Sequence, residues 1–233
     1  MSVLDLDAGN TFIKWRMAGS ELRGRLRHSE LTIAQWPSDV ERVRVSSVAG
    51  EQVNQALHQF VSQRWQVQPE FAVTQAAACG VSNSYSDPSR MGVDRWLALL
   101  SAWQQEQGAC WVVDCGSAIT VEQLSGNGQH LGGYIIPGLQ LMGRSLLMNT
   151  AEVIVDQTIA GFDATPGVNT SEAVHHGVNL LLESLAEKVM RKAAGQPVYV
   201  TGGDGELFCS LVEGATWCPD LVLDGLPLAL GAE

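Results

Sequence analysis

Residues 7–14, Asp-Ala-Gly-Asn-Thr-Phe-Ile-Lys, combine an acid, a tight turn and a lysine, as a phosphate-binding hairpin does. A turn that contains glycine lets backbone N–H groups approach phosphate oxygens, because no side chain blocks them. Asp7, at the end of a strand, could hold Mg²⁺ through water, and Lys14 across the hairpin could add a positive charge. An ordinary hairpin with an Asx turn explains the same residues, so this segment alone leaves both interpretations open.

A second segment of the same kind, residues 114–117, Asp-Cys-Gly-Ser, follows a buried strand in the other half of the chain. Two such loops that face each other would hold a triphosphate between two domains. The pair therefore indicates nucleotide binding more strongly than either loop, although a coincidental strand and turn is the alternative. The glycine loop at 201–205 could lie against a nucleotide, but a plain turn explains it equally well.

Residues 92–95, Gly-Val-Asp-Arg, begin an amphipathic helix and have the composition of a site for an alcohol substrate. To phosphorylate an alcohol, a carboxylate accepts the hydroxyl proton while cations neutralise the phosphoryl oxygens. Asp94 is placed for that role, and Arg95 could bind a substrate carboxylate with its planar guanidinium. The alternative is an acid that stabilises the first turn of a helix, next to an arginine at the surface.

The composition limits the classes of partner. The chain has 233 residues, 45% hydrophobic and 17% charged, which are values of a globular protein. Its net charge of -11 and the lack of a basic stripe argue against nucleic-acid binding. An anion such as ATP must then be bound by local devices, such as backbone N–H groups or a bound cation. Five cysteines without a C-x-x-C pair, no apolar run long enough for a bilayer and no signal peptide predict a cytoplasmic protein without a membrane partner.

The order of the expected elements indicates a duplication. Strands are expected at 3–7, 11–17, 23–28, 42–46, 71–74, 109–114, 118–124, 130–136 and 198–201, and helices at 51–65, from 92, at 139–149, after a cap at 169, and at 206–211. Each half begins with three strands and has a glycine turn after an acid. The expected organisation is therefore two closely packed α/β domains, 1–108 and 109–233.

The motifs resemble those of the type III pantothenate kinases, in the acetate and sugar kinase–Hsp70–actin superfamily, over the whole chain and in order. Residues 7–14 and 114–120 resemble the two phosphate motifs of the family. The segment from Tyr85 through Pro88 to Arg95 resembles its pantothenate segment, and 130–139 and 169–177 are also similar to the family. Gly92-Val-Asp94-Arg95 is the discriminating element, since the glycine loops occur throughout the superfamily.

The resemblance implies a duplicated actin-like ATPase fold of the ribonuclease H-like type, with two mixed-sheet domains flanked by helices. It implies that Asp94 is the general base and that Asp114 holds a monovalent cation, K⁺ or NH₄⁺. The residues implied in ATP binding are Asp7, Ala8, Gly9, Asn10, Thr11, Phe12, Ile13, Lys14 and Ser117. The residues implied in pantothenate binding are Tyr85, Gly92, Val93, Asp94, Arg95 and Thr170, the last from the other subunit of a homodimer. Ser117 stands where many relatives have threonine, and the exchange keeps the hydroxyl.

The activity expected from the resemblance is ATP-dependent phosphorylation of the 4′-hydroxyl of pantothenate, the first step towards coenzyme A, with Mg²⁺ and a monovalent cation. Two alternatives stay open. One is a non-catalytic accessory or regulatory protein that keeps the fold, against which the three acids Asp7, Asp94 and Asp114 argue. The other is a different small-molecule kinase or phosphatase of the same superfamily, which fold alone does not exclude.

Overall fold

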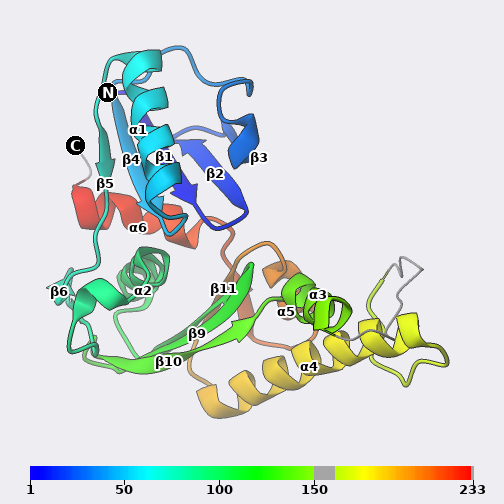
Figure 1. The fold of residues 1–233 in the computed structure, drawn as a ribbon. Helices are drawn as coiled ribbons and strands as arrows, with labels where there is room; N and C mark the ends of the chain where they lie inside the picture. Colours follow the sequence, from blue (N-terminus) through cyan, green and yellow to red (C-terminus); the bar gives the residue numbers. More distant parts are fainter. Residues whose placement is uncertain (150–160, 232–233) are drawn as a thin grey trace. The chain divides into compact units, whose positions relative to one another are not determined.

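Two five-stranded sheets with the same strand order form the framework of the chain in the computed structural model, which describes residues 1–149 and 161–231 (Figure 1). The first has the order β3-β2-β1-β4-β5, with β1 (Val3–Ala8), β2 (Phe12–Met17), β3 (Arg23–Arg27), β4 (Arg42–Ser47) and β5 (Pro69–Phe71). The second has the order β10-β9-β8-β11-β12, with β8 (Cys110–Cys115), β9 (Ala118–Leu124), β10 (His130–Pro137), β11 (Val198–Thr201) and β12 (Ala215–Trp217). Since the positions correspond one to one, the predicted duplication is confirmed.

The remaining elements are the helices and a small hairpin. They are α1 (Glu51–Trp65), α2 (Val93–Glu106), α3 (Leu139–Asn149), α4 (Thr170–Ala193), α5 (Gly205–Ser210), α6 (Leu221–Leu230), 3-10 turns at His28–Glu30 and Pro88–Arg90, and the strands β6 (Ala77–Ala78) and β7 (Val81–Ser82). The chain divides into two compact units. The first comprises Met1–Ala109, Glu122–Gly132 and Asp220–Glu233, and the second Cys110–Val121 and Gly133–Pro219.

The first sheet is mixed, and one of its faces is apolar while the other carries acidic residues. β1 runs antiparallel to β2 and parallel to β4. Because side chains alternate along a strand, Leu4 and Leu6 of β1 point to one face, where α1 supplies Leu57 and Val61 to a common core (Figure 1). The acids Asp5 and Asp7 therefore point to the opposite face, which places the polar side of β1 away from α1.

The last helix, α6, packs against β1, β4 and α2 of the first unit. The sequence analysis expected no helix after residue 211, and Gly225 and Pro227 inside α6 explain why, since both residues disfavour a helix interior. Gly225 is required by packing: a Cβ there would lie 2.4 Å from the carbonyl oxygen of Leu97 in α2. The helix is thus defined by its neighbours and not by its local propensity.

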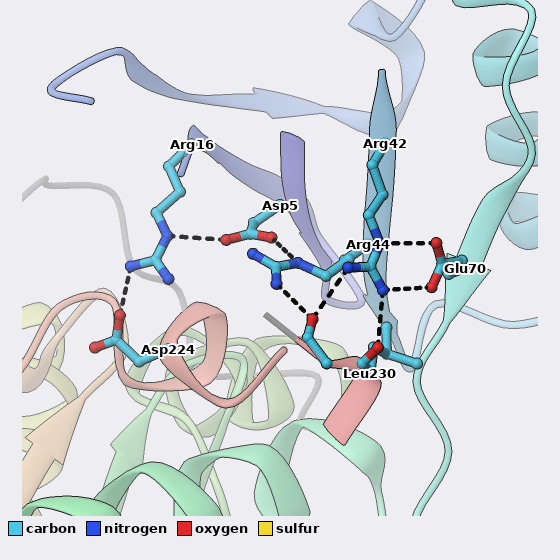
Figure 2. Close-up of polar contacts among 8 residues, drawn as sticks. Asp5, Arg16, Arg42, Arg44, Glu70, Asp224 and Leu230 are labelled. Atoms are coloured by element: carbon cyan, nitrogen blue, oxygen red, sulfur yellow. Dashed lines mark hydrogen bonds and ion pairs between the residues drawn. The ribbon is translucent and has the colours of Figure 1, made fainter. Parts of the chain in front are cut away.

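Arginines of β4 bind the carboxyl end of α6 (Figure 2). The last carbonyls of a helix have no partner within it. Arg42 donates to the carbonyl of Leu230 at 2.8 Å and to that of Gly231 at 3.1 Å, and Arg44 also donates to Gly231, at 3.0 Å. The fully buried carboxylate of Asp5 accepts from Arg44 Nε at 2.8 Å. This charge cluster attaches the carboxyl end of α6 to the first sheet.

The second sheet is covered by α4 and α5. Leu182, Ala186 and Val189 of α4 and Phe208 of α5 pack with buried residues of the sheet, which are Trp111, Val113, Cys115, Ile119, Val121, Val198 and Val200. Asn169 caps α4, as predicted: its side chain accepts a hydrogen bond from the backbone N–H of Glu172 at 2.9 Å. No helix among the described residues has the length and apolar character needed to cross a membrane.

Candidate active site

The hairpin of residues 7–14 forms at the end of β1, as predicted. The N–H of Gly9 donates to the carbonyl of Phe12 at 3.0 Å and closes the turn. His28, which follows β3, supports this turn through a hydrogen bond of 2.9 Å between its Nε2 and the carbonyl of Gly9. Asn10 and Thr11 at the tip are exposed. The turn therefore presents its tip to solvent while its base is held by His28, the residue that follows β3.

Asp7 lies on the polar face of the sheet, between Lys14 on β2 and Ser46 on β4, which are its cross-strand neighbours. The hydroxyl of Ser46 donates to Asp7 Oδ1 at 2.9 Å. Burial, followed by the negative charge of Asp94, raises the pKa of Asp7 from its ordinary 3.8 to about 6, and Lys14 and Ser46 only partly oppose this change. A carboxylate in such surroundings gains stability from an added cation.

Asp94 stands in the first turn of α2, next to a glycine that its position requires. The N–H of Arg95 donates to Asp94 Oδ1 at 2.8 Å. A Cβ on Gly92 would lie only 2.5 Å from the same oxygen, so a larger residue at 92 would displace the carboxylate. Burial raises the pKa of Asp94, while the hydrogen bond from Arg95 opposes the change. Such a carboxylate is a better proton acceptor than one in open water.

Arg95 is buried, with 7% of its surface exposed, and its guanidinium is already held by neighbouring side chains. Its Nε donates to Glu122 Oε1 at 2.5 Å, and its Nη1 donates to the hydroxyl of Tyr85 at 3.1 Å. The other oxygen of Glu122 is hydrogen-bonded to His130 Nε2 at 2.9 Å. The structure therefore brings the predicted substrate residues Tyr85, Asp94 and Arg95 together in the first unit.

Sequence reasoning assigned no role to Glu122 and gave His130 only as part of a motif. Both lie in the β9–β10 hairpin, whose end belongs to the first unit. The signal in the sequence was an acid inside the strand expected at 118–124, and the structure buries it next to Val121. A glutamate that is 1% exposed requires a partner, and here it has two. A strand pattern alone does not identify those partners.

In the second unit, Asp114 lies near the end of β8 and Ser117 lies in the turn that follows, and two glycines pack closely against them. A Cβ on Gly202 would lie 2.4 Å from Asp114 Oδ1, and a Cβ on Gly138 would lie 2.6 Å from the carbonyl oxygen of Ser117. Asp114 is also the register partner of Thr201, so the predicted glycine loop at 201–205 is adjacent to this acid. The two segments therefore lie side by side within the second unit.

Thr170, the remaining predicted residue, is exposed at the amino end of α4. It lines a cavity of about 790 Å³ in the second unit, together with apolar residues of α3 and α4 such as Leu146, Val174 and Leu181. The described residues contain no group of three or more His, Cys, Asp or Glu side chains that could bind a metal ion. A cation at Asp7 or Asp114 would therefore depend on one carboxylate with water, backbone or nucleotide oxygens.

Comparison with known proteins identifies the family. A model of the type III pantothenate kinases matches residues 3–192. A type III pantothenate kinase of Marinobacter nauticus is 40% identical over 233 residues, which cover 96% of either chain.

Two solved structures share the fold alone. A Campylobacter jejuni protein described as a conserved Baf family transcriptional activator has a TM-score of 0.60 at 21% identity and covers 95% of this chain and 94% of its own. A Sinorhizobium meliloti protein described as a 2-dehydro-3-deoxygalactonokinase has a TM-score of 0.61 at 13% identity, covering 97% of this chain and 95% of its own. The actin-like fold of the sugar kinases is thus confirmed, and the chain belongs to the type III pantothenate kinase family, which phosphorylates pantothenate in coenzyme A biosynthesis.

Proposed function

We propose that this chain transfers the γ-phosphoryl group of ATP to the primary 4′-hydroxyl of pantothenate, with Asp94 as the general base. The observation that carries the proposal is the partly buried Asp94 carboxylate, with its raised pKa, beside Arg95 and within electrostatic reach of Asp7. Asp94 would accept the hydroxyl proton as the oxygen bonds to phosphorus and ADP leaves. Family membership supports the reaction and its substrates.

The nucleotide would be bound by the hairpin of residues 7–14 and by Ser117. Asp7 suits a water-bridged Mg²⁺, because its raised pKa reflects burial and a neighbouring negative charge that a cation would offset. Asp114, near the end of β8 and closely packed by Gly202, would hold the monovalent cation. These cations would supply the positive charge that a chain with a net charge of -11 lacks, and would neutralise the phosphoryl oxygens during transfer.

Pantothenate would lie against Tyr85 and residues 92–95, with its carboxylate at the guanidinium of Arg95. Arginine suits this role because its planar N–H groups match a carboxylate. Asp94 would then receive the hydroxyl-bearing part of the molecule. The arrangement separates recognition of the anionic end from proton transfer at the alcohol.

A second copy of the chain would cover the cavity between α3 and α4 and bring Thr170 to the partner's substrate. The cavity is largely apolar, and Val168 and Leu181 beside it are 90% and 58% exposed, which is unfavourable in water. Analytical ultracentrifugation tests this assembly. A monomer at micromolar concentration with full activity would contradict it.

The decisive assay couples ADP release to pantothenate in the presence of Mg²⁺ and K⁺. The variant Asp94→Asn keeps the size of the side chain but loses the base, so turnover should fall by about 10²- to 10⁴-fold while the protein remains folded. Activity within a few-fold of the parent would remove Asp94 from this role. The parent should also be slower when Na⁺ replaces K⁺, and equal rates would argue against a cation at Asp114. No pantothenate-dependent ADP release at all would favour the accessory-protein alternative.

A further inference from the structure

A continuous chain of hydrogen bonds runs from a loop to the predicted carboxylate-binding arginine. Ser84 Oγ is 3.0 Å from His130 Nδ1, and His130 Nε2 is 2.9 Å from Glu122 Oε2. Glu122 Oε1 accepts from Arg95 Nε at 2.5 Å. His130 and Glu122 are 0% and 1% exposed, so the chain is shielded from water over its central part. Buried hydrogen bonds of this kind fix the orientation of their members.

The polarity of this chain is consistent from end to end. A histidine ring with its hydrogen on Nε2 donates to Glu122 and accepts from the hydroxyl of Ser84. Both oxygens of Glu122 are then acceptors, one from His130 and one from Arg95. Glu122 therefore provides the counter-charge of the buried guanidinium and, through His130, is itself fixed in place.

The tyrosine of the site is held by the same residues. Tyr85 accepts from Arg95 Nη1 at 3.1 Å, and its ring stacks on the ring of His130, with centroids 6.2 Å apart and planes at 22°. With Nε and Nη1 engaged, Nη2 of Arg95 has no partner among the described residues. The described residues contain three fully buried polar side-chain atoms without a partner, and Nη2 of Arg95 is not among them. Nη2 therefore stays accessible to a ligand.

The hairpin that carries Glu122 and His130 is anchored at its tip. The N–H of Ser82 in β7 donates to the carbonyl of Gly128 at 2.9 Å. Gly128 has a φ of +78°, and a Cβ there would lie 2.1 Å from the carbonyl oxygen of Gly80. Only glycine permits this approach, which sets the position of the hairpin against the β6–β7 turn.

We propose that Glu122 and His130 are positioning residues that hold the Arg95 guanidinium and the Tyr85 ring so that the enzyme selects a substrate with a carboxylate. This inference rests on the proposed function and adds the source of its selectivity. Neither residue would touch the reacting atoms. Loss of the counter-charge leaves Arg95 without a fixed direction, so binding of the carboxylate should weaken while phosphoryl transfer at the other end continues.

The first experiment compares Glu122→Gln with the parent enzyme. KM for pantothenate should rise by about 10- to 100-fold, the effect of losing one charge-assisted hydrogen bond, while kcat and KM for ATP stay within about threefold. An analogue with a primary alcohol in place of the carboxylate serves as the comparison substrate. The enzyme's preference for pantothenate over this analogue, measured as the ratio of their kcat/KM values, should fall by a similar factor. An equal loss for both substrates, or a loss in kcat alone, would overturn the proposal.

A matched pair at position 130 separates positioning from packing. Glutamine can place its amide nitrogen near the position of the histidine Nε2 and donate to Glu122, whereas asparagine reaches only as far as Nδ1. His130→Gln should therefore keep most of the selectivity and His130→Asn should lose it. Equal kinetics of the two variants would contradict the role of the Nε2 hydrogen bond. Glu70→Gln, which breaks the Arg42–Glu70 ion pair elsewhere in the first unit, is the control that should leave KM for pantothenate unchanged.

A readout without substrate keeps this test separate from that of the reaction. In ¹⁵N NMR spectra, the Nε–H of Arg95 should exchange slowly with water in the parent and faster by at least tenfold in Glu122→Gln, with the resonance assigned from Arg95→Lys. Rapid exchange in the parent would refute the positioning role even if the enzyme is active. Slow exchange in a parent that does not phosphorylate pantothenate would instead refute the proposed function and leave the positioning role supported.

Discussion

The carboxylate of Asp7 should lower the stability of the fold at neutral pH, so Asp7→Asn should stabilise the protein while it removes activity. Burial and the charge of Asp94 raise the pKa of Asp7 to about 6 in the folded chain, from the ordinary 3.8 that it regains on unfolding. The folded state therefore favours the protonated, neutral form. Asparagine imitates that form at every pH and can still accept the hydrogen bond from Ser46.

The size and the pH dependence of the effect follow from these two values. At about 1.4 kcal/mol for each pKa unit, the difference between 3.8 and about 6 corresponds to about 3 kcal/mol. The folded state binds the extra proton between these pH values, so the parent should lose this stability as the pH rises from about 4 to about 6. About 3 kcal/mol is an upper limit, because Asp7 is partly exposed and because the variant leaves Lys14 without its neighbouring charge.

Urea unfolding of both proteins at pH 4, 5, 6 and 7 measures the effect. Tryptophan fluorescence follows the unfolding, and five of the seven tryptophans lie in the first unit, which also contains Asp7. The variant should be more stable by about 1–3 kcal/mol at pH 7 and by almost nothing at pH 4, while ADP release is lost. A variant that is less stable than the parent at pH 7, or a gain that is the same at pH 4 and 7, would refute the reasoning.

Two substitutions test the packing of the first unit. Asp5→Asn should lower the unfolding free energy by about 3–5 kcal/mol, because Arg44 then lies buried without a counter-charge. The control Asp39→Asn changes an exposed residue and should have almost no effect. Equal effects of the two variants would show that the cluster in Figure 2 contributes little to stability. Gly128→Ala should raise KM for pantothenate more than KM for ATP, because the new Cβ displaces the hairpin tip. Gly126→Ala in the same hairpin, where the nearest atom is 3.9 Å from a new Cβ, should not, and a parallel response of both variants would contradict the anchoring role.

Local patterns were sufficient for most elements of both sheets. Alternation of apolar and acidic residues predicted β1, and the helical spacing at 51–65 gave α1 with its observed bounds. The cap at Asn169 fixed the start of α4. These features depend on residues close in sequence, so one chain is enough to find them. The domain boundary at 108 and 109 and the roles of the site residues stay predictions.

Features that depend on distant contacts were predicted less well. The strand expected at 71–74 is β5 at Pro69–Phe71, because pairing with Val43–Val45 of β4, and not composition, selects the residues. The helix α6 exists despite an internal glycine and proline, because α2 and the arginines of β4 surround it. Tertiary contacts here override a local preference against helix.

The residues around Arg95 show that a motif can locate a site without including all the residues that hold it in place. Gly92-Val-Asp94-Arg95 suggested an arginine that binds a substrate carboxylate, and the structure adds a buried counter-charge from Glu122, 27 positions further along the chain. A buried arginine without such an acid would be unfavourable by several kcal/mol, so the motif implies a partner that its own residues do not contain. The sequence offered Glu122, an acid inside the strand expected at 118–124, as the candidate for this partner. In this chain the acid at 122 is therefore explained by the Arg95 guanidinium that it binds.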